Sequence, residues 1–154
     1  MVKMICFDLD GTLADTYNVP NWLAMLDNSD PTPYIEAKPI YNPAELRALI
    51  QEAMDKGIDI EIITWLSKGS TNGFKAKSRK AKRQWLEKYN IPFHHFHGIS
   101  YGTTKADCVR DRLKNGESAI LVDDNKKIRD GWHLGKTIDP TEGNMIEILR
   151  KLLD

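Results

Sequence analysis

The sequence predicts an α/β fold in three layers, a parallel sheet of about five strands with helices on both faces. Three observations lead to this prediction. Short apolar runs, typical of strands buried on both faces, occur at residues 4–7 and 119–122, and residues 58–63 predict a further strand. Amphipathic helical patterns lie between them, and each run ends in polar residues. With 154 residues, we expect a single domain over residues 1–154.

The first strand leads directly into two aspartates, Asp8 and Asp10, followed by Gly11. Glycine allows a sharp turn, so both carboxylates stay at the carboxyl end of the strand, where ligands bind in open α/β sheets. Two carboxylates about 4 Å apart repel each other by roughly 4 kcal/mol at an effective dielectric constant of 20. A bound cation would relieve that repulsion.

Residues 13–42 differ in composition from the rest of the chain, and we expect them to form a loop or flap; in the family resemblance described below, this is the place of a short cap insertion. Five of the seven prolines lie between positions 20 and 43. We expect one short helix over residues 21–26 and extended chain elsewhere, since proline interrupts regular structure. Asn42, Pro43 and Glu45 then predict the start of a helix that ends at Gly57.

The second strand, residues 58–63, stops at Thr64, whose hydroxyl can donate to a phosphate oxygen. Trp65 follows, and it either packs against the fold or stacks on a base. A helix over residues 75–89 places Ala81, Trp85 and Tyr89 inward. Its six basic residues form either a solvated face or a rim that steers an anionic substrate, possibly a nucleic acid; they are Lys75, Lys77, Arg79, Lys80, Lys82 and Arg83.

A third strand, residues 91–99, puts His95 and His97 on one face and His94 on the other, as satisfied or exposed side chains. Thr103 and Thr104 then predict the N-cap of a helix over residues 105–113. Lysine in a first turn opposes the helix dipole, so Lys105 makes sense there if a phosphate lies at the helix start.

The fourth strand, residues 119–122, ends in Asp123 and Asp124. A short helix over residues 126–133 and an edge strand over 136–138 follow, and Thr141 is expected to cap a final helix. Residues 131–137 imitate a P-loop, but three residues separate the glycines where four are needed, so we reject that interpretation.

These motifs resemble those of the haloacid dehalogenase (HAD) superfamily, whose members are mostly phosphatases. The resemblance rests on residues 8–13, Thr64, Lys105 and the pair Asp123-Asp124, in this order along the chain. Residues 8–14, 102–107 and 122–124 also resemble the 3′-phosphatase domain of bacteriophage polynucleotide kinase, although no arginine follows Thr64. The resemblance implies a Rossmann-like, HAD-like fold with a minimal cap.

The resemblance also implies a Mg²⁺-dependent phosphomonoesterase that acts through an aspartyl-phosphate on Asp8, with Asp10 as acid and base. Thr64 and Lys105 would bind the phosphate. The metal ligands would be Asp8, Asp10, Asp123 and Asp124, since Mg²⁺ prefers hard oxygen donors. The expected substrate is a nucleotide or a nucleic-acid end; a 5′-nucleotidase or another small-metabolite phosphatase is the alternative. A receiver-like or inactive phosphate-binding module is the non-enzymatic alternative.

Composition limits the other classes of function. Apolar residues make up 41% and charged residues 29% of the chain, and the formal net charge is zero, which argues against wholesale nucleic-acid binding. No apolar run suits a membrane span or a signal peptide. Cys6 and Cys108 form neither a metal motif nor a disulfide framework. We therefore expect a cytoplasmic protein without a membrane partner, with a monomer favoured.

Overall fold

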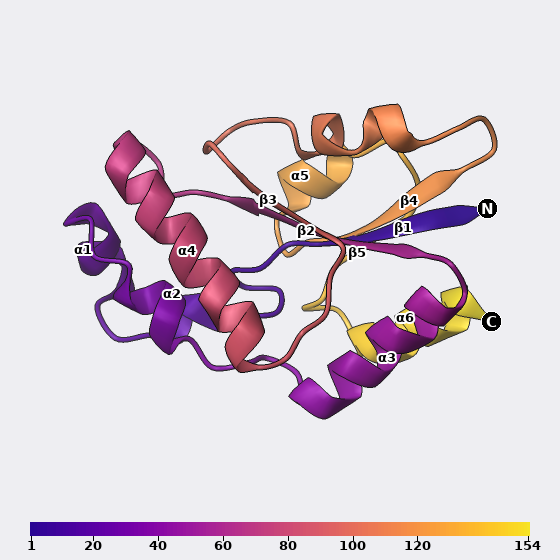
Figure 1. Cartoon of the computed structure of the whole chain (residues 1–154), viewed down its shortest axis with the longest axis horizontal. Helices are drawn as coiled ribbons and strands as arrows, with labels where there is room; N and C mark the ends of the chain where they lie inside the picture. The colour runs from indigo at the N-terminus through magenta and orange to yellow at the C-terminus, as the bar shows by residue number, and fades with distance from the viewer.

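The computed structural model describes residues 1–154 and contains one five-stranded parallel sheet (Figure 1). The strand order is β3-β2-β1-β4-β5, so the first strand lies at the centre. The strands are β1 (Val2–Phe7), β2 (Asp59–Trp65), β3 (His95–Ile99), β4 (Ser118–Val122) and β5 (Thr137–Ile138). The predicted fold class is confirmed, with a third strand that begins only at His95 instead of at residue 91.

Helices cover both faces of the sheet. The α-helices are α1 (Trp22–Asp27), α2 (Thr32–Glu36), α3 (Pro43–Asp55), α4 (Asn72–Lys88), α5 (Lys126–Asp130) and α6 (Met145–Leu153). Three 3₁₀ turns complete the set: η1 (Thr16–Asn18), η2 (Lys105–Cys108) and η3 (Arg110–Arg112). In Figure 1, α3 and α6 lie on one face of the sheet, and α5 lies on the other together with η2 and η3. None of the helices has the length and apolar character needed to cross a membrane.

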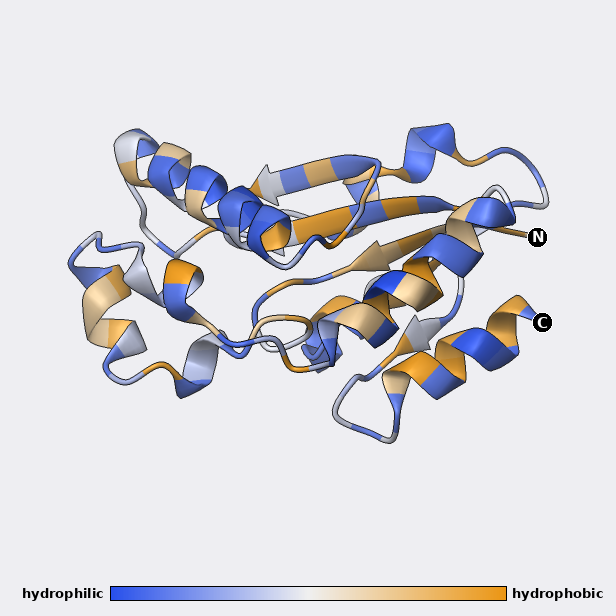
Figure 2. Ribbon diagram, turned by 60° about the horizontal axis from the view of Figure 1, so that its bottom comes forward, coloured by the Kyte–Doolittle hydropathy of each residue, from blue (hydrophilic) through white to orange (hydrophobic).

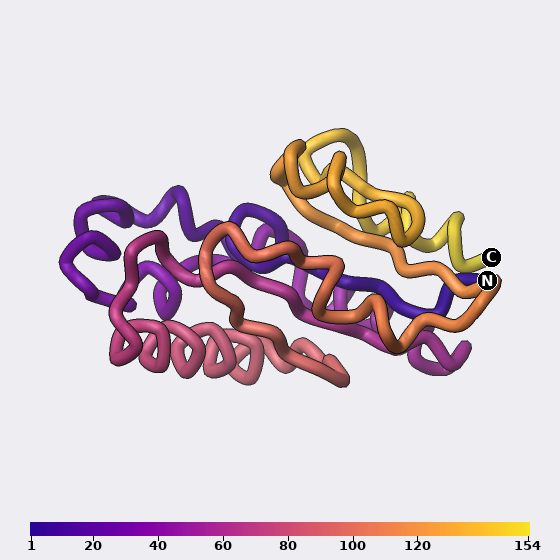
Figure 3. Tube along the Cα trace, turned by 90° about the horizontal axis from the view of Figure 1, so that it is seen from above, coloured from indigo at the N-terminus to yellow at the C-terminus, as the bar shows by residue number.

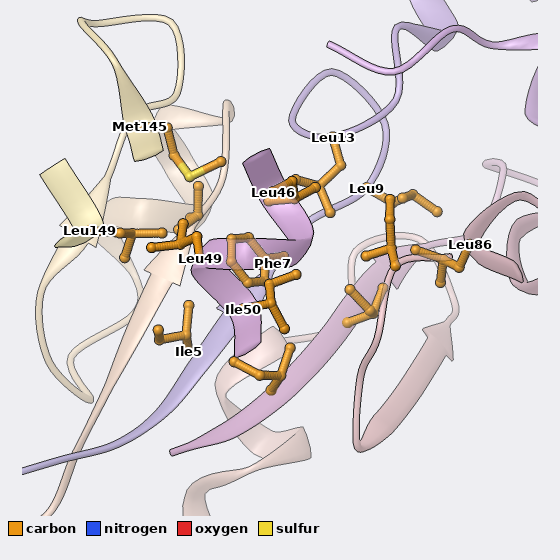
Figure 4. Close-up of a cluster of buried hydrophobic side chains, with 14 of the residues drawn as sticks. Ile5, Phe7, Leu9, Leu13, Leu46, Leu49, Ile50, Leu86, Met145 and Leu149 are labelled. Carbon is orange, nitrogen blue, oxygen red and sulfur yellow. The ribbon is translucent and has the colours of Figure 1, made fainter. Parts of the chain in front are cut away.

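Residues 4–7 of β1 and 119–122 of β4 are apolar and buried because both faces of the sheet are covered there. Ile5 and Phe7 of β1 point into the larger core, where they meet Leu49 of α3 and Leu149 of α6 (Figure 4). The alternate residues of β1 enter a second core against Trp132. Helices α3 and α6 alternate between hydrophilic and hydrophobic bands (Figure 2), and all of their buried residues are apolar. Burial on two sides explains the continuous apolar runs in the sequence.

Helix α3 starts as the sequence predicts. The Asn42 side chain accepts hydrogen bonds from the backbone N–H groups of Ala44 and Glu45, and Pro43 occupies the first turn. The predicted cap of the last helix is wrong, because α6 begins three residues later than Thr141 implied. Its N-cap is Asn144, whose side chain accepts from two backbone N–H groups. The helix predicted over residues 126–133 is shorter and ends at Asp130.

Residues 13–42 lie at the end of the molecule opposite the two chain termini (Figures 1 and 3). The expected short helix is present as α1, but the expectation of extended chain elsewhere is wrong, because α2 forms as well. Helix α2 is anchored on α4, where Tyr34 packs with Phe74 and Ala81. By contrast, α1 contains no buried residue. The two short helices of this segment are therefore held very differently.

The helix predicted over residues 105–113 is also wrong. The segment forms the two 3₁₀ turns η2 and η3, which meet at Val109. Val109 has φ −128° and ψ −15°, outside the helical range, because its side chain packs with Ala106 into the second core. Neither threonine caps η2 through its side chain. The argument that a helix dipole assists Lys105 therefore does not hold here.

The histidines of the third strand are satisfied side chains, as the sequence predicts. His95 and His97 lie on one face, where they contact the buried carboxylate of Glu61 on β2 at 2.7 and 3.0 Å. Arg112 of η3 donates to the same carboxylate. Burial raises the pKa of Glu61, but the hydrogen bonds from His97, Arg112 and His95 outweigh it and lower the pKa to about 2.

We predict that Glu61→Gln lowers the free energy of unfolding by about 2 kcal/mol at pH 7, because hydrogen bonds to a charged group are lost. A lowered pKa in the folded state gives stability that is present above pH 4.5 and is lost as the pH falls toward 2. The wild-type curve of unfolding free energy against pH should therefore fall steeply in that range, and the variant's curve should be flatter. Glu52→Gln, at an exposed ion pair, is the control. Parallel curves for the wild type and Glu61→Gln would contradict the prediction.

Candidate active site

The carboxyl ends of three neighbouring strands form one cavity of about 380 Å³. Asp8 and Asp10 follow β1, Thr64 belongs to the end of β2, and the paired aspartates follow β4. All six residues singled out in the sequence line this cavity: Asp8, Asp10, Thr64, Lys105, Asp123 and Asp124. The structure therefore brings together side chains that are up to 116 positions apart in the chain.

Asp8 is held on both sides. One carboxylate oxygen accepts from Lys105 Nζ at 2.9 Å and the other from Thr12 Oγ1 at 3.0 Å. Lys105 is buried and also donates to Asp123 at 2.8 Å. Burial alone would lower the pKa of Lys105, but the charges of Asp8 and Asp123 outweigh it and raise the pKa. Lys105 is therefore a fixed positive charge between two acids.

A third acid completes a cluster. One carboxylate oxygen each from Asp8, Asp123 and Asp124 lies within 4.8 Å of the others. Burial, followed by the charge of Asp8, raises the pKa of Asp123 to about 6 and that of Asp124 to about 7. Three hard oxygen donors that repel one another suit a divalent cation. The cluster fits the acids predicted from the sequence, apart from Asp10.

Gly11 makes this approach possible. Its φ of +77° lies in the left-handed region, and an added Cβ would come within 2.4 Å of Asp124 Oδ2 and 2.8 Å of the Tyr17 ring. No other residue fits there without displacing the acid. Gly11 therefore allows the turn after β1 and also lets the carboxylate of Asp124 approach the backbone at this turn.

The Asp10 side chain points away from the acid cluster. It accepts from Thr16 Oγ1 at 2.6 Å and from Lys82 Nζ at 2.8 Å. Lys82 is completely buried and also donates to Thr64 Oγ1 and to the carbonyl of Trp65, both at 2.8 Å. The ring of Tyr34 covers this ammonium group at 4.4 Å. A second buried lysine therefore joins Asp10 to Thr64.

The sequence did not lead us to predict that Lys82 belongs to this site. The interpretation of the basic helix treated all six basic residues as one face, either solvated or steering. The periodicity contained a signal, because Lys82 lies four residues after Ser78 and three before Trp85, both buried on the inner face of α4. A lysine on an inner stripe requires a buried partner, and here the partner is Asp10.

The other basic residues of α4 divide into two groups. Lys75, Arg79 and Arg83 lie along the edge strand β3: Lys75 donates to Ser100, Arg79 donates to the carbonyl of Gly98, and Arg83 lies over a phenylalanine ring. Covering an edge strand with charged side chains protects it from pairing with other chains. Only Lys77 and Lys80 remain exposed without such a contact.

Comparisons with known proteins identify solved structures that have a similar fold. No family model and no curated protein matches the chain. The structure of the Pnkp1/Rnl/Hen1 RNA repair complex is similar with a TM-score of 0.59 and 17% identity, over 89% of this chain and 41% of that chain. The D,D-heptose 1,7-bisphosphate phosphatase from Burkholderia thailandensis is similar with a TM-score of 0.52 and 10% identity, over 99% of each chain.

This chain therefore spans less than half the length of the repair-complex chain that it matches. At such low identities the likeness shows the fold alone. Because it extends over nearly the whole chain, the Rossmann-like α/β fold expected from the sequence is confirmed. The reaction has to be argued from the site.

The acid cluster leads to a prediction about pH and cations. In the folded, cation-free protein Asp123 and Asp124 hold protons that the unfolded chain, with a pKa near 3.8, releases. The free energy of unfolding should therefore fall as the pH rises from about 4 to about 7. Millimolar Mg²⁺ should reverse that loss at pH 7, since a ligand of the folded state stabilises it.

Thermal unfolding with and without Mg²⁺ measures both effects, and the double variant Asp123→Asn/Asp124→Asn should remove them. Asp111→Asn, at an exposed acid outside the cluster, is the matched control. A wild-type midpoint that does not respond to Mg²⁺ would count against a cation site.

Proposed function

We propose that the protein is a Mg²⁺-dependent phosphomonoesterase that forms an aspartyl-phosphate on Asp8. The observation that carries the proposal is the position of Asp8. Its carboxylate lies between a buried lysine and two further acids, and Asp10, two residues on, lines the same cavity with its own lysine. The fold that this chain shares with a solved phosphatase supports the proposal.

In the first half-reaction a carboxylate oxygen of Asp8 attacks phosphorus, and the bond between phosphorus and the ester oxygen breaks. Asp10 gives its proton to the departing oxygen. In the second half-reaction Asp10 takes a proton from water, the water oxygen attacks phosphorus, and the bond to Asp8 breaks. Inorganic phosphate leaves, and Asp8 is restored.

Two groups that line the cavity would face the transferring phosphoryl group, and a third, Lys82, holds their surroundings in place from beneath. Lys105 and Thr64 would donate to its oxygens and stabilise the charge that spreads over them. Lys82 is hydrogen-bonded to both Asp10 and Thr64, so it positions the acid relative to the phosphate-binding hydroxyl. Both lysines are buried in the fold and hold these groups in place before a substrate binds.

The residues fit a magnesium ion. Asp8, Asp123 and Asp124 supply the clustered carboxylates, and the backbone carbonyl of Asp10 is the fourth protein ligand that we propose. When bound, the ion neutralises the charge of phosphate and acids, so that a dianionic substrate can approach. Asp10 would bind the ion through its backbone carbonyl and not through its carboxylate, because the carboxylate already accepts hydrogen bonds from Thr16 and Lys82.

The substrate class that we propose is a nucleotide or a nucleic-acid terminal phosphate. The resemblance of the motifs to a polynucleotide 3′-phosphatase domain and the shared fold with the RNA repair complex support it. The aromatic residues that line the cavity favour a substrate with a base, as opposed to a sugar phosphate.

We predict that Asp8→Asn abolishes Mg²⁺-dependent phosphate release and that Asp10→Asn lowers it by roughly 10² to 10⁴. The measurement is phosphate release over a panel of nucleotides, 3′- and 5′-phosphorylated oligonucleotides and sugar phosphates, with and without Mg²⁺. Asp111→Asn is again the control. Normal turnover by Asp8→Asn would exclude the covalent mechanism.

We also predict that Lys82→Met lowers kcat by roughly 10² or more, because Asp10 and Thr64 lose the group that links them. Methionine has a similar length and avoids leaving a cavity. Lys80→Met, two residues away on the exposed face of α4, should leave kcat unchanged. Equal kcat values for the two variants would show that Lys82 has no part in turnover.

A further inference from the structure

The cavity has a second region beyond the acids, and that region is aromatic and apolar. Trp65 and Tyr101 form one wall, with ring centroids 4.9 Å apart. The indole N–H of Trp65 donates to the carbonyl of Thr103 at 2.8 Å, which fixes the ring. Lys105 Nζ lies 5.9 Å from the centre of the Trp65 ring. An aromatic surface, formed by two rings whose planes meet at 54°, therefore begins one side chain away from the proposed phosphate position.

The opposite wall comes from the segment over residues 13–42. Trp22, Leu23 and Leu26 of α1 line the cavity, and Tyr17 packs edge-on against Trp22 at 4.9 Å. Helix α1 has five apolar residues among six but buries none of them, and Leu23 is 55% exposed. Apolar residues left open beside a cavity indicate a surface that a ligand covers.

The charged residues that line the cavity argue against a polyanion, such as a nucleic-acid strand, as the substrate. Besides Lys105, the only basic residue that lines it is Lys68, and Asp27 lines it as well. None of the basic residues of α4 lines the cavity: three lie along β3, Lys82 lies beneath the site, and the others are exposed. A nucleic-acid strand that continued past its terminal phosphate would find few cations for its further phosphates.

We propose that this site accepts the monophosphate of a single nucleoside, with its base between the Trp65–Tyr101 wall and α1, and discriminates against the end of a nucleic-acid chain. The inference rests on the proposed phosphatase activity and narrows its substrate class. The volume of about 380 Å³ suits one small ligand. Stacking of one base on aromatic rings contributes about 1–3 kcal/mol.

The first experiment compares kcat/KM, in Mg²⁺, for three kinds of substrate. They are 3′- and 5′-nucleoside monophosphates, an oligonucleotide that carries its terminal phosphate on the same nucleoside, and glycerol phosphate, which has no ring. We expect the best nucleoside monophosphate to exceed both others by roughly tenfold or more. Its kcat/KM should depend little on salt, because a single phosphate is recognised.

The second experiment substitutes Tyr101 in the aromatic wall of the cavity. Tyr101→Ala should lower the ratio of kcat/KM for the nucleoside monophosphate to that for glycerol phosphate by roughly fivefold or more, and Tyr101→Phe should retain the ratio. Tyr101 is 54% exposed, so the fold should tolerate both changes. Ile40→Ala, at an apolar residue that is also exposed but lies outside the cavity, is the matched control.

A binding measurement tests recognition of the nucleoside independently of phosphate hydrolysis. In the Asp8→Asn protein a nucleoside monophosphate should quench tryptophan fluorescence, since Trp22 and Trp65 line the cavity, and inorganic phosphate should not. A preference for the oligonucleotide, or an unchanged ratio in Tyr101→Ala, would overturn the inference and leave the phosphatase intact. Failure to hydrolyse any ester would overturn the proposed function, and the inference with it.

Discussion

The repulsion among the three clustered carboxylates at one end of the sheet is the constraint on which the rest of the structure depends. Asp8, Asp123 and Asp124 lie within a few ångströms of one another, and Asp10 follows two residues behind the first. At such distances each pair costs several kcal/mol in a partly buried site. Two buried lysines, from separate parts of the chain, offset part of this charge. The excess negative charge that remains is what a divalent cation would neutralise.

The acids themselves were predictable from the sequence because local features determine them. A strand buried on both faces needs a continuous apolar run, and the polar residue that ends it lies at the carboxyl end of the sheet. Gly11 marked the turn after β1, and the structure shows that only glycine fits beside Asp124. The cap of α3 by Asn42 was predictable for the same reason, since its hydrogen bonds reach only two and three residues ahead.

Features that depend on distant contacts were not predictable in this way. Lys82 lies within a run of basic residues. Its spacing from Ser78 and Trp85 places it on the inner stripe of α4, but only the fold shows that Asp10 and Thr64 are its partners. Helix α2 is five residues long and depends on packing against α4, so proline content alone indicated extended chain. The 3₁₀ turns around Val109 likewise follow from the shape of the second core.

Trp65 joins the two regions of the cavity. Its carbonyl oxygen accepts from Lys82, so its main chain belongs to the network that holds Asp10 and Thr64. Its ring faces the other way and forms the aromatic wall with Tyr101. The Trp65 indole donates a hydrogen bond to the carbonyl of Thr103, which is two residues before Lys105. The aromatic wall is therefore also connected to the segment that carries the second lysine. A ligand that contacts this ring would therefore rest on the same residues that set the spacing of the charged groups. In the phosphatase that we propose, the fit of the leaving group and the position of the phosphate would both depend on one short segment at the end of β2.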